Sequence, residues 1–446
     1  MRPATWTARP ERKVLMRMRS VGLAGALLLA FLPAASANAS PDDSPSAPHA
    51  FVEHGIRGKP LTFSSPDPNA FVEKGWRKAP ATLPPGGVLL GRPAAADDPD
   101  EPPPPPTKEQ CLNRPEAEVT PPEPGDENDT LAGWYKDRYG WCAWGTMKAE
   151  GKDAETGLEV AEFTVRFVII GYGNNGARQF DYNVYLDRFD YVGPIKWDLA
   201  TMSVRISGCN ETTMDCPTTR HGTLPAWQAA PNAAFTVTSP EVSGGGEQIL
   251  SGDLQVAIDF ATPAEPEWVW GAPNGVTVAH TPIRYDSATY VGRARGAIFP
   301  AYRLTFVVDS IADNQDESAL HIKQAFERPQ LTWPSWQGKT VPGRTEPLTR
   351  MYNPAANSSN RNKSENMCRK IYGDWDSNLD NCDEFPFAST YEGSKTGPDK
   401  YGWGERYSVR LIDKTDNQYV GRQMLETEFY RPLRVLDGDP FYVAVR

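Results

Sequence analysis

The chain has 446 residues, more than a single hydrophobic core usually holds, so we expect at least two domains together with segments outside any core. Its formal net charge of −11 argues against electrostatic binding of nucleic acid by the protein surface as a whole. The last part differs, because residues 311–446 carry 18 Lys and Arg against 20 Asp and Glu, so a nucleic-acid site is not excluded there.

Residues 1–39 have the pattern of a secretory signal peptide. Basic residues between Arg12 and Arg19 precede an apolar run over residues 21–32, and small residues at 35–39 offer a cleavage site. The pattern predicts a secreted, extracellular protein. The apolar run is too short for a comfortable membrane span, and no later stretch approaches the roughly 20 apolar residues that a span needs, so we expect no transmembrane segment.

Residues 40–125 are rich in Pro, Ala, Asp and Gly, and they include an unbroken proline run from Pro102 to Pro106. Such a composition buries too little apolar surface to offset the entropy lost on ordering. It predicts a disordered spacer or a pro-region.

Six cysteines follow the predicted cleavage site, which fits three disulfides in an oxidising compartment. Neighbour pairing is the simplest of the possible connectivities. It joins Cys111 with Cys142, Cys209 with Cys216, and Cys368 with Cys382. Zinc is the competing interpretation, but the sequence has no C-x-x-C pair and no local Cys/His cluster, which argues against it.

Residues 126–309 have the alternation of antiparallel β-strands. Apolar side chains recur at every second position over residues 163–169, and similar runs lie near residues 180–186, 202–206, 254–260 and 302–308. Alternation with Gly, Pro and Asn between the runs indicates strands with one buried face. We therefore expect a β-sandwich-like accessory domain. The glycine-containing stretch at 171–176 favours a hairpin turn over a phosphate loop, because no helical pattern follows it.

This β-region is also rich in tryptophan, at positions Trp134, Trp141, Trp144, Trp197, Trp227, Trp268 and Trp270. Exposed tryptophans would suggest a face that binds cell wall or polysaccharide. Aromatic side chains in a β-sandwich are more often core residues, which is the interpretation we favour.

Residues 310–446 have a mixed pattern. Apolar residues at helical spacing from Ala319 to Phe326 follow acidic residues, as a helix start favours, and Pro329 and Pro334 stop that helix. The Pro-, Gly- and Asn-rich stretch beyond them predicts a loop, which carries the basic cluster Arg361, Lys363, Arg369 and Lys370. Strands are expected at 407–412 and 441–445 with a helix at 421–429 between them. Together these elements predict a small α+β domain tethered by a disulfide.

Hydrolysis of a phosphodiester with a metal needs oxygen ligands for a hard cation, a base or metal-bound water, and donors for the phosphate. The last domain offers each of them. Its carboxylates are Asp383, Glu384 and Glu392, its neutral oxygen donors Asn417 and Gln418, and its basic residues include Arg361. Sets of this kind occur in most surface loops, so composition alone is a weak signal.

The motif Asp383-Glu384-Phe385-Pro386-Phe387-Ala388, followed by Glu392-Gly393, resembles the signature of the NucA/NucB family of secreted bacterial deoxyribonucleases. Further matches keep the family order: residues 319–322, Asn360-Arg361 before a cysteine, Asp416-Asn417 followed by Gly421, and Leu436-Asp437-Gly438-Asp439. The resemblance covers residues 309–446. It implies a nuclease domain at 310–446 that acts on DNA with a divalent metal, Mg²⁺ or Mn²⁺.

The resemblance also implies roles for single residues. Asp383 would be the principal catalytic carboxylate and would bind the metal, Glu392 would be a second acid or base, and Asn417 a ligand of metal or phosphate. Glu384 is either catalytic or the carboxylate that fixes Arg361, and the second role is slightly favoured. Two positions depart from the family pattern: Tyr391 precedes Glu392 where some members carry a second glutamate, and Gln418 follows Asn417 where an arginine is common.

His321 lies at the start of the predicted helix and has two interpretations. Histidine is a common general base or substrate contact in nucleases, but at the start of an amphipathic helix it more often packs or forms structural hydrogen bonds.

The leading hypothesis is therefore a secreted, metal-dependent, non-specific endodeoxyribonuclease. The alternative is a non-catalytic protein that binds the cell envelope or matrix through the tryptophan-rich β-region. A nuclease toxin delivered to competitors is a third possibility.

Overall fold

The computed structural model describes residues 100–113, 117–118, 133–207, 214, 219–240, 247–263, 268–270, 276–402 and 405–446. The predicted signal peptide, most of the predicted spacer and the predicted Cys209–Cys216 pair lie outside these residues. In the described part of the chain, no helix is long and apolar enough to cross a membrane.

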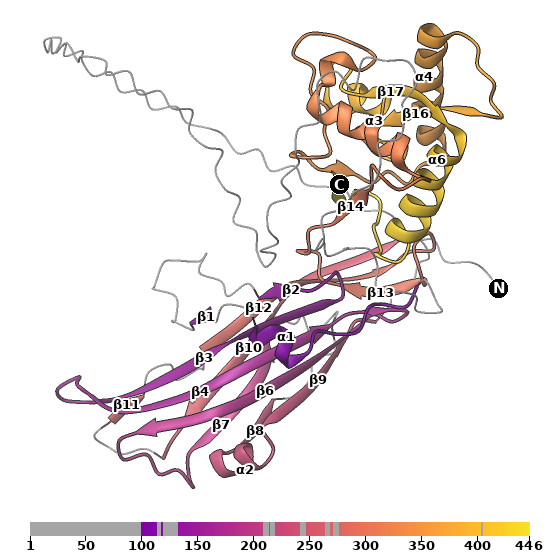
Figure 1. Cartoon of the computed structure of the whole chain (residues 1–446). Coiled ribbons are helices and arrows are strands. Elements are labelled where there is room, and N and C mark those ends of the chain that lie inside the picture. Colours follow the sequence, from indigo (N-terminus) through magenta and orange to yellow (C-terminus); the bar gives the residue numbers. More distant parts are fainter. Residues whose placement is uncertain are drawn as a thin grey trace, which may run out of the picture. The chain divides into compact units, whose positions relative to one another are not determined.

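The β-rich part contains two sheets (Figure 1). The first has the strand order β1-β3-β4-β6-β9, with β2 and β11 paired to β3. Its strands are β1 (Ala117–Glu118), β2 (Trp134–Tyr135), β3 (Gly140–Asp153), β4 (Glu159–Tyr172), β6 (Gln179–Val192), β9 (Asn232–Thr238) and β11 (Trp268–Trp270). All of its pairings are antiparallel except that of β1 with β3.

The second sheet has the order β5-β13-β12-β10-β7-β8 and is antiparallel throughout. Its strands are β5 (Asn174–Asn175), β7 (Thr201–Ser207), β8 (Arg220–Thr223), β10 (Gln248–Ala261), β12 (Val276–Ser287) and β13 (Arg295–Ile298). Two short helices accompany the sheets, α1 (Lys108–Leu112) and α2 (Leu224–Ala229). The hairpin turn expected at 171–176 is confirmed, because β4 ends at Tyr172 and pairs antiparallel with β6, which begins at Gln179.

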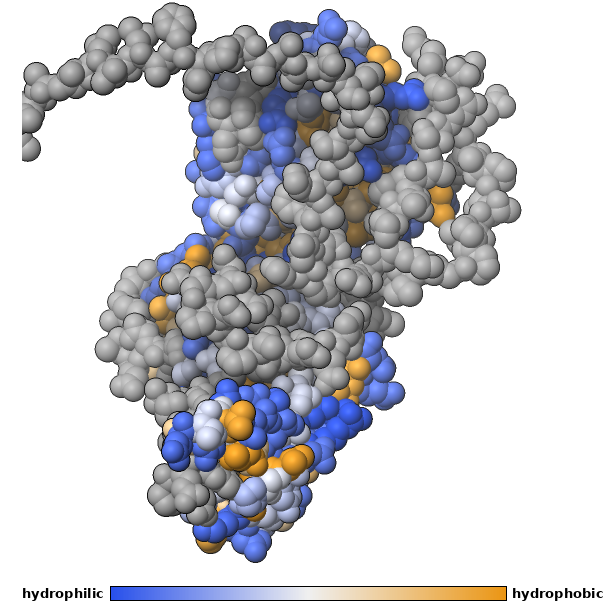
Figure 2. Space-filling view, turned by 90° about the vertical axis from the view of Figure 1, so that its left-hand side faces the viewer, coloured by the Kyte–Doolittle hydropathy of each residue, from blue (hydrophilic) through white to orange (hydrophobic). Residues whose placement is uncertain are grey.

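Side chains of both sheets form one hydrophobic core. Strand β7 alternates strictly between half-buried and buried positions, which confirms the predicted one-sided strand. Among the tryptophans, Trp141, Trp144 and Trp227 are buried, so the core interpretation is confirmed for these three. On the face drawn in Figure 2, apolar surface occurs as small separate patches among hydrophilic residues.

The C-terminal part combines helices with two small sheets. One sheet has the order β14-β18-β15 and the other is the hairpin of β16 and β17. The strands are β14 (Thr305–Val308), β15 (Leu348–Thr349), β16 (Asp380–Phe385), β17 (Ser408–Asp413) and β18 (Pro440–Val445). The helices are α3 (Asp316–Glu327), the 3₁₀ turn η2 (Pro329–Leu331), α4 (Pro354–Tyr372), α5 (Thr396–Tyr401), α6 (Lys414–Gln418) and the π-helix η3 (Tyr419–Tyr430).

Several C-terminal predictions are confirmed, among them helix α3, strands β17 and β18, and the helix between those strands. The loop predicted for the basic cluster is wrong, because these residues lie in the 19-residue helix α4. Asn353 starts this helix by accepting hydrogen bonds from the backbone N–H groups of Ala355 and Ala356, and Pro354 occupies its first position, where a missing N–H costs nothing.

Two of the three predicted disulfides lie within the described residues, and both are confirmed. Cys111–Cys142 joins α1 to β3, and Cys368–Cys382 joins α4 to β16. The second disulfide therefore fixes a helix, rather than a loop, against the strand that carries Asp383.

A buried cluster of charges connects strand β12 and the segment between β2 and β3 to the segment before β18. We call it the arginine–aspartate cluster; its members are Arg138, Arg284, Asp286, Arg434 and Asp439. Both oxygens of Asp439 accept from Arg284, at 2.7 and 2.8 Å, and Arg138 donates to Asp439 at 2.7 Å. Asp286 accepts from Arg434, whose side chain is fully buried. Each buried charge thus has an opposite partner, as burial in a low-dielectric interior requires.

Candidate active site

The β16–β17 hairpin places adjacent carboxylates on different faces. Side chains alternate along a strand, and residue 382 is bonded by its disulfide to α4, so Asp383 faces away from that helix and Glu384 faces toward it. Asp383 pairs with Arg410 across the hairpin and contacts His321 of α3. The sequence motif therefore supplies two separate carboxylate environments.

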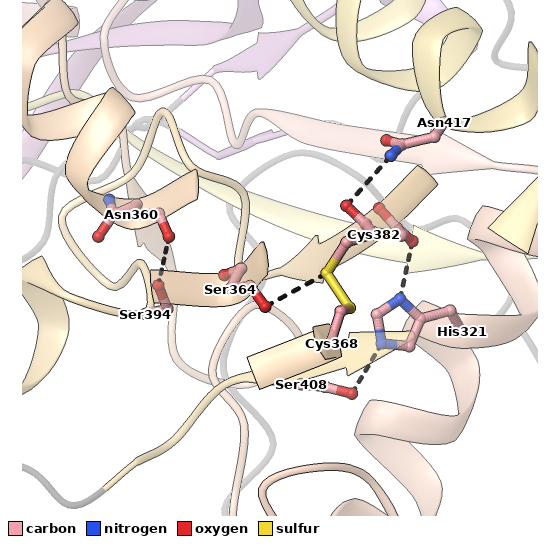
Figure 3. Close-up of a disulfide and its surroundings, with 9 residues drawn as sticks. His321, Asn360, Ser364, Cys368, Cys382, Ser394, Ser408 and Asn417 are labelled. Atoms are coloured by element: carbon pink, nitrogen blue, oxygen red, sulfur yellow. Dashed lines mark hydrogen bonds and ion pairs between the residues drawn. A yellow bond between two sulfur atoms is a disulfide. The ribbon is translucent and has the colours of Figure 1, made fainter. Parts of the chain in front are cut away.

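Asp383, His321 and Ser408 form a continuous hydrogen-bonded chain (Figure 3). His321 Nδ1 lies 2.7 Å from Asp383 Oδ2, and His321 Nε2 lies 2.7 Å from Ser408 Oγ. The imidazole is 1 % exposed and the Asp383 residue 8 % exposed, while Ser408 is fully buried. We call this arrangement the Ser408–His321–Asp383 chain.

The burial of its three members limits the chemistry of the Ser408–His321–Asp383 chain. A carboxylate only accepts hydrogen bonds, so His321 donates from Nδ1, and in its neutral form it accepts the Ser408 hydroxyl proton at Nε2. Ser408 is at the buried end and cannot meet a substrate as a nucleophile. The arrangement instead orients Asp383, which is the member with some access to solvent.

Glu384 lies in a different electrostatic environment. Burial raises the pKa of its carboxyl group to about 8, the negative charges of Asp383 and Glu365 act in the same direction, and Arg361 of α4 opposes them. The charge of Arg361 thus acts on the Glu384 carboxyl group, and the role of Glu384 in fixing Arg361 stays a prediction.

Glu392 lies in the turn region after β16 and is buried. Its Oε2 accepts a hydrogen bond from the backbone N–H of Thr349 in β15 at 2.7 Å. This bond joins the motif to the three-stranded sheet.

Asn417 lies in α6 beside the same strand. Its Nδ2 donates to the backbone carbonyl oxygen of Cys382 at 3.3 Å, which puts the amide next to the residue that precedes Asp383 (Figure 3). Its neighbour Asp416 accepts from the backbone N–H of Glu317 at 3.1 Å, and burial raises the pKa of the Asp416 carboxyl to about 6. Helix α6 is thus attached both to β16 and to the start of α3.

Asn360 is a structural residue to which the sequence analysis gave no role. Its Nδ2 donates to Ala388 O at 2.9 Å and to Thr396 Oγ1 at 3.0 Å, and its Oδ1 accepts from the N–H groups of Lys395 and Thr396 at 2.8 and 2.9 Å. This fully buried amide holds the segment that follows the motif against α4. The Asn353-Pro354 helix-start signal could have indicated α4, and with it a buried helix face of Asn360, Ser364 and Cys368 at spacings of four residues.

The donor atoms near Asp383 suit a hard cation. Among the described residues, no three His, Cys, Asp or Glu side chains gather closely enough to hold a metal ion by themselves. Mg²⁺ is nevertheless commonly held by only one or two carboxylates together with water. Asp383, oriented by His321, and the amide oxygen of Asn417 fit that pattern.

A shallow pocket lies on the surface of α6 and η3. The pocket has a volume of about 420 Å³ and is lined by Lys414, Thr415, Gln418, Tyr419, Arg422, Gln423 and Thr427. Its charged residues are both cationic: Lys414 lies on α6, the helix of Asn417, and Arg422 lies on η3, which follows it.

Comparison with protein-family models identifies the C-terminal region. Residues 338–444 match the family model described as deoxyribonuclease NucA/NucB. The matched residues include five of the six predicted site residues, while His321 lies before them. No curated protein and no solved structure matches the chain. Residues 338–444, at the C-terminal end of this chain, are a NucA/NucB deoxyribonuclease domain.

Proposed function

We propose that the chain is a secreted, metal-dependent endodeoxyribonuclease that hydrolyses DNA phosphodiester bonds with little sequence preference. The observation that carries the proposal is the buried Ser408–His321–Asp383 chain inside a region that matches a deoxyribonuclease family. In this chain the buried His321 orients the Asp383 carboxylate, and Asp383 is the member nearest to solvent.

In this proposal His321 positions Asp383, and Asp383 together with Asn417 holds Mg²⁺ or Mn²⁺ through oxygen atoms. When bound, the cation supplies positive charge for the phosphate and for the charge that develops on it. Arg361, kept in place by Glu384 on the α4 side of the hairpin, binds another phosphate of the DNA. Glu392 acts as a second acid or base, or fixes the position of the motif through Thr349.

Contacts to phosphate carry no sequence information, so this arrangement predicts cleavage at many sequences and a strong decrease in binding with salt. Export is part of the proposal because of the signal pattern over residues 1–39 and the two disulfides, which persist in oxidising compartments. An export test is the recovery of the processed chain from the medium of cells that express the full gene.

The decisive test is digestion of supercoiled plasmid by the oxidised protein with Mg²⁺ or Mn²⁺, with and without chelator. Asp383→Asn is expected to lower the rate roughly 10²–10⁴-fold. Asp380→Asn is the matched control, because this aspartate lies on the same strand and pairs with Asp413 at the far end of the hairpin. Cleavage that persists in chelator, or full activity of Asp383→Asn, would contradict the proposal.

A further inference from the structure

The loop between η2 and β15 displays two exposed tryptophans. Trp333 is 48 % exposed and Trp336 is 39 % exposed, and they are the exposed tryptophans among those whose side chains the structure describes. We call residues 332–339 the indole loop. Both indoles precede the residues that match the nuclease family, so the family match assigns them no role.

A buried lysine holds this loop in shape. Lys339 Nζ donates to Thr332 O, Thr332 Oγ1 and Pro334 O at 3.2, 2.8 and 2.9 Å, and the residue is 3 % exposed. Burial lowers the pKa of Lys339 to about 7. Its role is therefore to fix the loop by hydrogen bonds rather than to supply positive charge for a ligand.

The indole of Trp336 and the backbone of Trp333 are also restrained. Trp336 Nε1 donates to the backbone oxygen of Glu405 at 3.2 Å, and the Trp333 carbonyl accepts from the Val409 N–H at 2.8 Å. An exposed aromatic side chain usually loses entropy when it binds a ligand. Restraint before binding reduces that cost, which favours recognition over accidental exposure.

The register relates the loop to the candidate active site. Trp333 forms an antiparallel bridge with Val409, and Val409 pairs with Glu384. Directly paired residues lie on the same face of a sheet, so the three residues form one row, with Trp333 roughly 10 Å, or two strand spacings, from Glu384. That face is also the one next to α4 and Arg361.

Basic residues border the loop. Lys363 of α4 lies 3.5 Å from a carboxylate oxygen of Glu405, and Arg406 donates to Thr340 O at 3.3 Å and to Glu346. Aromatic faces interleaved with cations are typical of surfaces that bind single-stranded nucleic acid, because every base has a face that can stack.

We propose that Trp333 and Trp336 form a stacking platform for unpaired bases of the DNA substrate, on the face of the hairpin that carries Glu384 and lies next to Arg361, while Asp383 lies on the opposite face. The proposal rests on the proposed nuclease function and deepens it by naming the substrate form that is favoured. Single-stranded DNA, or a duplex that has opened locally, can place bases on the indoles, whereas a stacked duplex cannot.

The test measures binding without cleavage, using the full chain in chelator and fluorescently labelled oligothymidylate, single-stranded and annealed to oligoadenylate. Trp333→Ala and Trp336→Ala are each expected to weaken single-strand binding roughly five- to hundred-fold and to leave duplex binding nearly unchanged. Trp333→Phe should retain most of the affinity, because it keeps an aromatic face. Leu331→Ala is the matched control, since Leu331 is exposed just before the loop and has no aromatic ring.

Unchanged single-strand binding in both alanine variants would overturn the proposal, and so would an equal loss in Leu331→Ala. Binding of an insoluble polysaccharide that is lost in the alanine variants, with DNA binding retained, would also overturn it in favour of a sugar-binding role. Failure of the nuclease function itself is separate, because it appears as absence of plasmid cleavage by the unaltered protein with either metal.

Discussion

His321 connects the candidate catalytic carboxylate to the interior. Its two ring nitrogens contact Asp383 and Ser408 at 2.7 Å each, and the imidazole is buried. A carboxylate oriented in this way loses little freedom when it binds a cation or a substrate. The role resembles that of a residue that supports a metal ligand from behind.

His321→Ala is expected to lower activity roughly 10–100-fold, because partners that orient metal ligands have effects of that size. It should also raise the metal concentration needed for half-maximal plasmid cleavage, which a purely structural defect would not do. The matched control is His280→Ala, which removes a similar histidine–aspartate contact, His280 with Asp253 at 3.1 Å, on the surface of the β-rich part. An unchanged metal dependence in His321→Ala would contradict the positioning role.

Glu384 gives a prediction about pH. Its folded-state pKa of about 8 is higher than its ordinary value of 4.5, so the folded protein binds more protons than the unfolded chain between these values. Stability therefore decreases as pH rises from about 5 to 8. Glu384→Gln removes this contribution, so its melting temperature should exceed that of the unaltered protein at pH 8.5, by about 2–8 °C for a gain of about 1–2 kcal/mol, and by much less at pH 5.

The measurement is thermal unfolding at both pH values by circular dichroism. Glu365→Gln serves as the comparison, because Glu365 is an exposed carboxylate on α4 whose charge acts on Glu384 of β16. A pH-independent difference between Glu384→Gln and the unaltered protein would show that the carboxyl group does not titrate as described.

At the scale of elements, α4 is the helix on which the site depends. It carries Arg361, the disulfide to β16, and Asn360, which holds the chain that follows the motif. The period-two alternation of the strands and the limits of α3 could be predicted from the sequence, because a buried strand face, an acidic first turn and a following proline are local patterns. Helix α4 could not be predicted by composition, because its first half consists mainly of Asn, Ser, Pro and Ala, and its stability comes from tertiary contacts.

Asn360→Ala tests the contribution of α4. Removing the amide leaves buried backbone N–H and C=O groups without their partner, so a loss of about 2–4 kcal/mol in the free energy of unfolding is expected. Urea unfolding measures the loss, and Asn362→Ala is the control, since this asparagine is exposed on the same helix. Equal stabilities of the two variants would mean that the Asn360 contacts do not contribute.

The candidate site was partly visible in the sequence for a similar reason. The motif marked Asp383, Glu384 and Glu392 because they are close together in the chain. The link from His321 to Ser408 joins residues far apart in the sequence, and no local pattern reports which distant hydroxyl a buried imidazole will meet. Lys339 has partners close by in the sequence, Thr332 and Pro334, but no regular element lies between them to give a periodic signal.

At the scale of the whole molecule, the arginine–aspartate cluster makes the β-rich part a structural partner of the nuclease domain. Asp439 belongs to a turn in which Asp437 accepts from the N–H of Tyr352 at 2.7 Å and from the hydroxyl of Tyr391. Tyr391 precedes Glu392. The cluster therefore supports the turn that contacts the motif.

Asp286→Ala should destabilise the full chain by about 3–5 kcal/mol, because it leaves Arg434 buried without its partner. The matched control is Asp259→Ala, which removes a more exposed partner of Arg205 at 3.8 Å and should change stability by less than about 1 kcal/mol. Chemical unfolding compares the two variants. A small effect of Asp286→Ala would mean that the two parts of the chain fold independently.

Residues 304–446, which keep strand β14, are expected to cleave plasmid poorly when expressed alone, because Arg434 and Asp439 then lose their opposite charges. Full activity of this fragment would contradict the structural role of the β-rich part. Solubility and circular dichroism of the fragment distinguish an unfolded product from a folded but inactive one.

The strand order of the small sheet has a consequence for biosynthesis. Strand β18 lies between β14 and β15, and its parallel pairing joins Thr305 to Tyr442. Pairing between such distant residues is slow and needs all the intervening chain. A polypeptide still emerging from the ribosome, or one clipped before Pro440, lacks the centre of that sheet. Such an incomplete chain also lacks the partner of β15, whose Thr349 N–H donates to Glu392 of the motif, so the position of Glu392 depends on the strand that is made after it.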